Sequence, residues 1–177
     1  LSELDANFTF VSDSTNLSFL QSGTGAVSRT VQAKERDIVS VKDFGAVGDG
    51  VTDDSAAFVL AFAANLSVQG DSGAIYKIKD ITLTNSQVFN GNGCRLTSAT
   101  GAAYLFKLTN FAAIVQNVYV SDASTCSEAA IVFDNGHFCG FFDSVIINAT
   151  TVFRLKATTA ASGCIKPRIG RVQVQTI

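Results

Sequence analysis

Acidic side chains that could act as catalytic groups are few beyond residue 73. Hydrolysis of a glycosidic bond uses two carboxyl groups held about 5–5.5 Å or about 6.5–9.5 Å apart. A lyase instead needs a general base beside the sugar carbon that loses its proton. No sequence spacing ties the acids beyond residue 73 to one another, so we expect them to serve turns or the surface; they are Asp80, Asp122, Glu128, Asp134 and Asp143.

The histidine and the aromatic residues give few further candidates. His137 is the sole histidine, and without a partner acid fixed by spacing we expect it to be solvent-facing or structural. Tyr104 and Tyr119 are the better candidates for stacking on a sugar ring, because tyrosine combines an apolar ring with a polar tip. Several phenylalanines recur at similar positions and are expected to stack in the core; they are Phe106, Phe111, Phe133, Phe138 and Phe153.

The cysteines show neither a CxxC pair nor the spacing of zinc ligands; they are Cys94, Cys126, Cys139 and Cys164. We expect buried thiols that behave as small apolar side chains. One or two disulfides are the alternative in an oxidising compartment. No phosphate-binding, nucleophile-elbow or zinc-protease motif is present. The sequence therefore predicts no metal and no cofactor, and it leaves the catalytic residues unknown.

Composition restricts the class of protein. The 177 residues are 47% hydrophobic and only 16% charged, which favours a folded domain over disorder. A net charge of −2 provides no basic surface for nucleic acid. No apolar run is long enough for insertion into a membrane. The chain begins at Leu1 without a Met and stops inside a strand-like pattern over 171–175, so we expect a piece of a longer protein.

The elements that must position any site are organised around residues 39–66. The stretch begins as a strand and continues into a loop with Gly45, Gly48 and Gly50, where glycine reaches positive φ without strain. Thr52 or Asp53 is expected to cap a helix that starts at Ser55. That helix is apolar all round, with Phe58, Leu60 and Phe62 expected to plug the core. Its other side must then be covered by the N-terminal segment or by another subunit.

The residues before this stretch have weaker patterns. Residues 1–20 fit a short helix or a strand, and the glycine-containing segment 21–25 indicates a flexible boundary. Residues 26–37 have apolar side chains four apart and alternating charges, which predicts a short exposed helix.

From residue 73 onward the pattern alternates with the period of two that is typical of strands. Residues 105–111 align with 132–138, and residues 117–120 align with 144–147 and 171–174, at an offset of about 27 residues. The repeat predicts stacked coils in which Val118, Val145 and Val172 lie one above another. An antiparallel sandwich is the alternative, but it would need hairpin turns every 8–12 residues or so.

Residues 41–54, VKDFGAVGDGVTDD, closely resemble the motif that begins the helix in the pectate-lyase-like right-handed β-helix superfamily. Residues 19–32 look like the segment that precedes the β-helix in bacteriophage tailspike and tail-fibre proteins. The resemblance implies a mainly β fold: a right-handed parallel β-helix (pectin-lyase-like solenoid) preceded by a capping α-helix and a short helical N-terminal attachment segment. It also implies that Asp43, Asp49, Asp53 and Asp54 serve the fold rather than chemistry.

The resemblance further implies three segments: 1–38 for attachment to the virion, 39–72 for the start of the β-helix and its capping helix, and 73–177 for its first coils. The expected protein is a homotrimer in the phage tail, made in the bacterial host cytoplasm. Its N-terminal segment would bind a tail, baseplate or portal-proximal protein, and its β-helix would bind bacterial surface polysaccharide.

Two alternatives remain open at this point. The protein could be a polysaccharide depolymerase, a hydrolase or lyase acting on capsule or lipopolysaccharide, whose active site this segment lacks. Glu128 or Asp122 close to Asp143 on neighbouring coils would favour that alternative. A secreted bacterial glycan-binding β-helix is the other.

Overall fold

The computed structural model describes residues 15, 17–156 and 167–175. Most of the helix or strand expected over residues 1–20 lies outside the described residues, as does Cys164. The chain divides into two compact units, Leu1–Ile38 and Val39–Ile177. No helix in the described part is long and apolar enough to cross a membrane.

The first unit holds a small sheet and one short helix. Strand β1 (Ser18–Phe19) pairs antiparallel with β2 (Arg29–Thr30), and α2 (Val31–Glu35) follows directly. The Thr30 side chain accepts a hydrogen bond from the Ala33 N–H at 3.0 Å and so caps the helix. The helix expected over 26–37 is therefore shorter than predicted, because Arg29 and Thr30 pair with β1. None of its five residues is buried.

The second unit begins with β3 (Val39–Ser40), the 3-10 helix η1 (Val41–Phe44), β4 (Asp49–Asp53), α3 (Ser55–Ala64) and β5 (Ser67–Gln69). The strand expected from residue 39 is thus only two residues long, and the expected glycine loop contains β4, which pairs with β6. Gly45, Gly48 and Gly50 do have positive φ, at 92°, 70° and 76°.

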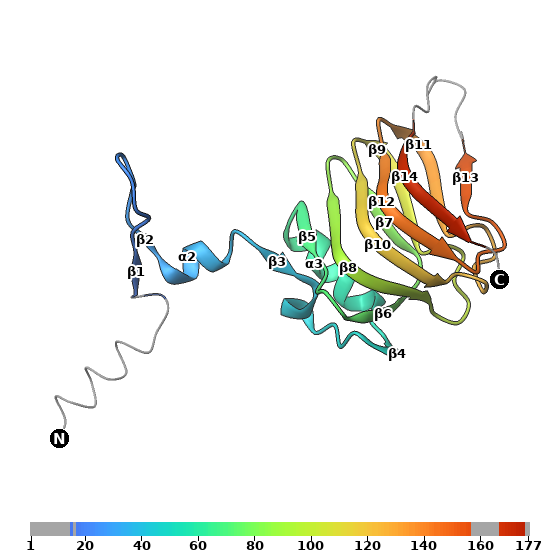
Figure 1. The fold of residues 1–177 in the computed structure, drawn as a ribbon, viewed down its shortest axis with the longest axis horizontal. Helices are drawn as coiled ribbons and strands as arrows, with labels where there is room; N and C mark the ends of the chain where they lie inside the picture. The colour runs from blue at the N-terminus through green and yellow to red at the C-terminus, as the bar shows by residue number, and fades with distance from the viewer. Residues whose placement is uncertain (1–14, 16, 157–166, 176–177) are drawn as a thin grey trace. The chain divides into compact units, whose positions relative to one another are not determined.

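The rest of this unit is a stack of strands (Figure 1). They are β6 (Ile75–Ile78), β7 (Ile81–Thr84), β8 (Val88–Ser98), β9 (Phe106–Phe111), β10 (Ile114–Asp122), β11 (Ile131–His137), β12 (Gly140–Ile147), β13 (Phe153–Lys156) and β14 (Arg168–Gln175).

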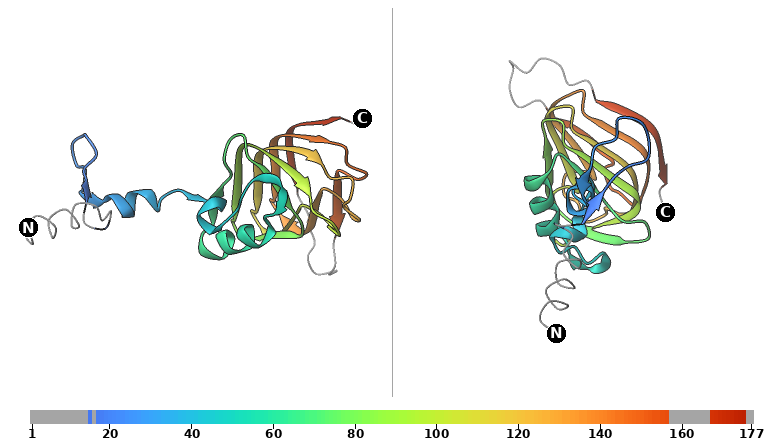
Figure 2. Two further views of the ribbon diagram at one scale, coloured as in Figure 1. Left: turned by 90° about the horizontal axis from the view of Figure 1, so that it is seen from below. Right: turned by 90° about the vertical axis from the view of Figure 1, so that its left-hand side faces the viewer.

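The strands form two parallel sheets. One has the order β14-β12-β10-β8-β5-β3, with β6 also on β8, and the other has the order β13-β11-β9-β7. Every pairing in both sheets is parallel. From β7 onward successive strands alternate between the two sheets, so the chain passes through both in each coil (Figure 2). The fold is therefore mainly β with parallel sheets, as predicted, and no strand from β3 onward pairs in an antiparallel hairpin among the described residues.

The register corrects the predicted repeat. Tyr119 pairs with Val145, and Val145 with Gln173. Val118 instead lies beside Ser144, whose Oγ accepts a hydrogen bond from the Val118 N–H, and Ser144 pairs with Val172. The predicted column of valines is thus wrong at Val145. Coils of unequal length cause the error, because a shift of one residue turns a strand side chain to the opposite face.

The core is a stack of aromatic rings capped by one face of α3. The Phe89 ring lies 5.2 Å from Phe58 and 5.5 Å from Phe106, centroid to centroid. Phe58 and Phe62 of α3 are buried, but Leu60 is 55% exposed, so its predicted place in the plug is wrong. The prediction of stacked core phenylalanines holds for Phe106 and Phe133; Phe111 and Phe138 are exposed instead, and Phe153 is half-buried.

Carboxylates hold the loop that leads into α3. Asp54 is buried, and its two carboxylate oxygens accept hydrogen bonds from the N–H groups of Val47 (2.7 Å) and Gly48 (3.2 Å). Asp54 occupies the N-cap position but makes no side-chain cap hydrogen bond. Of the two residues expected to cap the helix, Asp53 does so, since its Oδ1 accepts from the Ser55 N–H at 3.0 Å. The Thr52 hydroxyl donates to Asp49 instead, at 2.9 Å.

Replacing Asp54 with asparagine should destabilise the fold. The asparagine amide would place a donor against one of the two N–H groups, at a cost of about 2 kcal/mol. Urea unfolding followed by circular dichroism measures the change. Asp53→Asn is the matched control, because asparagine keeps the Oδ1 that accepts from the Ser55 N–H and the exposed Lys79 ion pair is worth under about 1 kcal/mol. Equal losses in both variants would contradict a special role for Asp54.

A methyl group at Gly91 should also destabilise the stack. A Cβ built there would lie 2.6 Å from the Asn117 carbonyl oxygen on the next coil. Because backbone cannot give way cheaply, Gly91→Ala should cost about 3 kcal/mol in urea unfolding. Gly73→Ala, at φ +83° with open space around it, should cost only about 1 kcal/mol.

Candidate functional site

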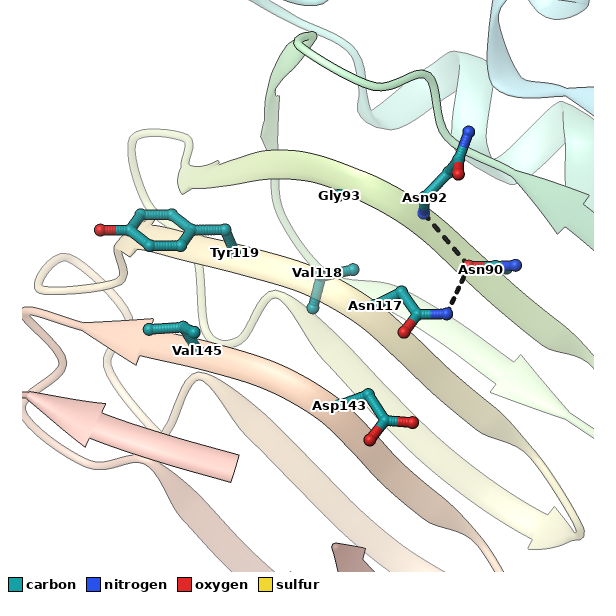
Figure 3. Close-up of a pocket in the computed structure, with 8 residues that line it drawn as sticks. All are labelled: Asn90, Asn92, Gly93, Asn117, Val118, Tyr119, Asp143 and Val145. Carbon is teal, nitrogen blue, oxygen red and sulfur yellow. Dashed lines mark hydrogen bonds between the residues drawn. The ribbon is translucent and has the colours of Figure 1, made fainter. Parts of the chain in front are cut away.

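A shallow hollow of about 460 Å³ lies on the outward side of the larger sheet, over β8, β10 and β12 (Figure 3). It is lined by amide, aromatic and carboxylate side chains of three neighbouring strands: Asn90, Asn92, Gly93, Asn117, Val118, Tyr119, Asp143 and Val145. Strands of adjacent coils run about 4.8 Å apart, so equivalent side chains on successive coils form a row.

Residues with a left-handed backbone conformation occur in this row of side chains. Asn92, Asn117, Asp143 and Arg171 lie on β8, β10, β12 and β14 and have φ between 50° and 55°. Asn and Asp tolerate this conformation better than other residues with a side chain. Asn90–Gly93, whose Asn-Gly pairs are typical of turns, is thus a bend inside β8. Three of these residues, Asn92, Asn117 and Asp143, line the hollow.

Hydrogen bonds orient the amides of the hollow. The Asn90 Oδ1 atom accepts from the Asn92 backbone N–H at 3.1 Å and from Asn117 Nδ2 at 3.0 Å. Figure 3 shows the amide oxygen of Asn117 directed away from Asn90. The amides are therefore fixed before any ligand arrives, which lowers the entropic cost of binding.

Two of the charged side chains around the hollow pair with each other, and a third lies on an aromatic ring. Asp143 accepts from Arg171 through both carboxylate oxygens, with Nε–Oδ1 at 2.5 Å and Nη2–Oδ2 at 3.1 Å. The Arg95 guanidinium lies over the Tyr119 ring, 5.2 Å from its centroid. The hollow therefore presents an aromatic ring, neutral amides and one neutralised carboxylate.

Acid–base catalysis of glycoside hydrolysis requires a pair of carboxyl groups. Asp143 is the one carboxylate among the side chains that line the hollow. Glu128 is bound instead to the Lys156 ammonium at 2.6 Å, which lowers the pKa of its carboxyl group. Asp122 accepts from the Ser124 N–H and from Asn148, and Asp80 from two backbone N–H groups. These contacts match the turn and surface roles expected for Asp80 and Asp122.

The other candidate residues lie apart from the hollow's lining. His137 pairs in register with Phe111, not with Asn110 as the repeat suggested. Tyr104 has the Lys107 ammonium 5.2 Å from its ring centroid. Asp134, expected to serve a turn or the surface, is in β11. Of the two tyrosines proposed for sugar stacking, Tyr119 lines the hollow.

The described cysteines are buried free thiols: Cys94, Cys126 and Cys139. Burial raises the pKa of Cys94 to about 12 and that of Cys126 to about 11. Thiolates would therefore be rare at neutral pH, and these residues are poor nucleophiles. Among the described residues no cluster of three or more potential metal ligands occurs.

The sequence pointed to Tyr119 but missed the amides and Arg171. A signal was present, since Asn-Gly-Asn-Gly over 90–93 marks backbone that bends to positive φ. Its meaning depended on the register, because only the stacking of Asn90 against Asn117 turns separate bends into one surface.

The sequence relatives of this chain are phage tail proteins. It is 42% identical over 57 residues to the tail spike protein of an Escherichia phage, a match that covers 32% of this chain and 7% of that protein. It is 36% identical over 90 residues to the pre-neck appendage protein of Bacillus phage B103, covering 48% of this chain and 10% of that protein. These relatives confirm the predicted resemblance to phage tailspike and tail-fibre proteins and the predicted location in the virion.

Among solved structures, ORF18 of Geobacillus virus E2 shares the fold, with a TM-score of 0.55 and 17% identity, over 74% of this chain and 32% of that one. No family model matches. The chain matches a tenth or less of the length of the two relatives named above.

Neutralising either member of the Asp143–Arg171 pair should leave the fold intact. The Arg171 side chain is 86% exposed, so solvent screens the pair and its loss should cost under about 1 kcal/mol. Asp143→Asn and Arg171→Gln should therefore unfold in urea close to the unmodified chain. A larger loss in either variant would mean that the pair holds the last coil in place.

Proposed function

We propose that this chain is the virion-proximal part of a phage tailspike or tail fibre, and that it begins a β-helix used to recognise host surface polysaccharide. The observation that carries the proposal is the match to two phage tail proteins in a chain whose strands stack in parallel coils. In this proposal residues 1–38 attach to the virion, 39–72 start and cap the β-helix, and 73–177 form its first coils.

The coils are proposed to wind as a right-handed, pectin-lyase-like β-helix. From β8 to β14, each pair of adjacent strands in the larger sheet, such as β8 and β10, is parallel and is joined through a strand of the other sheet. Parallel strands connected in this way have a right-handed crossover in about 98% of cases.

The attachment role is proposed for residues 1–38 because they form a compact unit of their own. The helix α2 in that unit buries none of its residues, so the unit has little apolar core to hold it and would gain stability from a partner. A tail, baseplate or portal-proximal protein of the phage is the proposed partner.

A homotrimer is supported by the uncovered side of α3. Val59 and Leu60 are each 55% exposed, although the helix has no charged residue. Apolar side chains gathered on one face of a helix favour burial against another chain.

Polysaccharide recognition is proposed at the hollow over β8, β10 and β12. An aromatic ring beside preoriented amides suits a sugar, whose C–H groups would contact the ring away from the Arg95 guanidinium while its hydroxyl groups bond to the amides. The depolymerase alternative is supported by no carboxylate pair in this hollow, so any such activity would belong to the rest of the protein.

Removing the Tyr119 ring should weaken polysaccharide binding. Tyr119→Ala should raise the Kd about tenfold, since one aromatic contact contributes about 1–1.5 kcal/mol, whereas Tyr119→Phe should retain most of the affinity. The measurement is biolayer interferometry on immobilised lipopolysaccharides and capsular polysaccharides from a panel of bacteria.

Tyr104→Ala is the matched control, because Tyr104 is a half-buried tyrosine outside the hollow. Failure of the unmodified chain to bind any polysaccharide in the panel would count against recognition by these coils. Reducing ends or unsaturated uronates released from the same polysaccharides would favour the depolymerase alternative instead.

A further inference from the structure

Several apolar side chains lie along one side of the stack, from the end of α3 to β12. The fold of a single chain leaves them exposed or half-buried. We call these residues the lateral strip; they are Leu66, Val88, Phe111, Ile114, Phe138 and Phe142. Leu66, Phe111 and Phe138 are exposed, at 58%, 54% and 45%, and the others are half-buried.

Register pairing makes the strip continuous. The Val88 N–H donates to the Leu66 carbonyl at 2.7 Å, and Val88 pairs with Ile114, which pairs with Gly140. The Phe142 ring lies over Gly140, where a Cβ would overlap it. Strand alternation turns these side chains away from the core, since Phe89, Val115 and Phe141 beside them are fully buried.

An aromatic pair extends the strip at the corner between the two sheets. The rings of Phe111 and Phe138 meet edge to face, with centroids 5.6 Å apart. Phe138 has a φ of 56°, a conformation that is unfavourable for a bulky side chain. Exposing these rings to water does not stabilise the fold of a single chain. Contact with another chain therefore explains their position better.

We infer that the lateral strip is the surface through which copies of this chain pack side by side. The strip carries no charge, and the next residue in the Gly140 column is Arg168, one coil further. Two such strips can therefore face each other without burying like charges. Around the hollow, by contrast, Arg95, Asp143 and Arg171 are charged.

The repeat of the strip identifies a second copy as the occupant. Its members lie on successive coils, so contacts recur at the inter-strand spacing of about 4.8 Å. A partner that touches every level needs the same repeat along its own length, and the same strip on a parallel copy supplies it at equal height. This inference rests on the proposed homotrimer and names the surface that forms it.

The mass of the chain in solution tests the inference. By light scattering after size exclusion the unmodified chain should be a trimer, and the double variant Phe111→Ser/Phe138→Ser should shift to monomer or raise the dissociation constant at least a hundredfold. Ile114→Lys, which buries like charges between copies, should have the same effect. Circular dichroism should be unchanged, because the two phenylalanines are not part of the core.

Val51→Ser is the matched control, because Val51 is an apolar residue that is 75% exposed but outside the strip; it should remain trimeric. If both strip variants remain trimeric, the inference is wrong but the proposed homotrimer stands. Dissociation of the trimer by Val59→Lys would then identify α3 as the contact. A monomeric unmodified chain overturns both. Strip variants that keep the trimer but lose polysaccharide binding would also overturn the inference, since the strip would then bind glycan.

Discussion

The parallel hydrogen-bond ladder between coils is the constraint on which the rest of this structure depends. Each strand takes its register from the strand below, so residues in one column share the same environment whatever the length of the loops between them. Phe89 and Phe106 stack because their strands belong to facing sheets of the same coils. The same constraint places polar residues in rows on the outside, where Asn90 meets Asn117.

Several parts of this organisation could be predicted from sequence. The period of two beyond residue 73 predicted the strands, and the approximate repeat predicted their stacking. The glycine-rich loop before α3 predicted the positive φ angles of Gly45, Gly48 and Gly50. These features depend on the local sequence pattern and on backbone sterics. Neither depends on which residues of neighbouring strands pair with each other.

What could not be predicted depends on the exact length of each coil. A constant offset aligned Val118 with Val145, whereas the ladder sets Val118 beside Ser144. The exposed positions of Leu60, Phe111 and Phe138 were missed for a related reason. Hydrophobicity predicts burial but not which chain provides it. The lining of the hollow comes from three neighbouring strands, so it depends on how these strands pair.

The helix α3 has a consequence for how the smaller sheet ends. It packs on η1 and on β7, the first strand of that sheet, and the Gln87 amide donates to the Phe62 carbonyl near its last turn. A strand in that position would offer a row of unsatisfied N–H and C=O groups to any other chain, whereas a helix satisfies its own. The helix therefore protects this edge of the smaller sheet from pairing with a strand of another molecule.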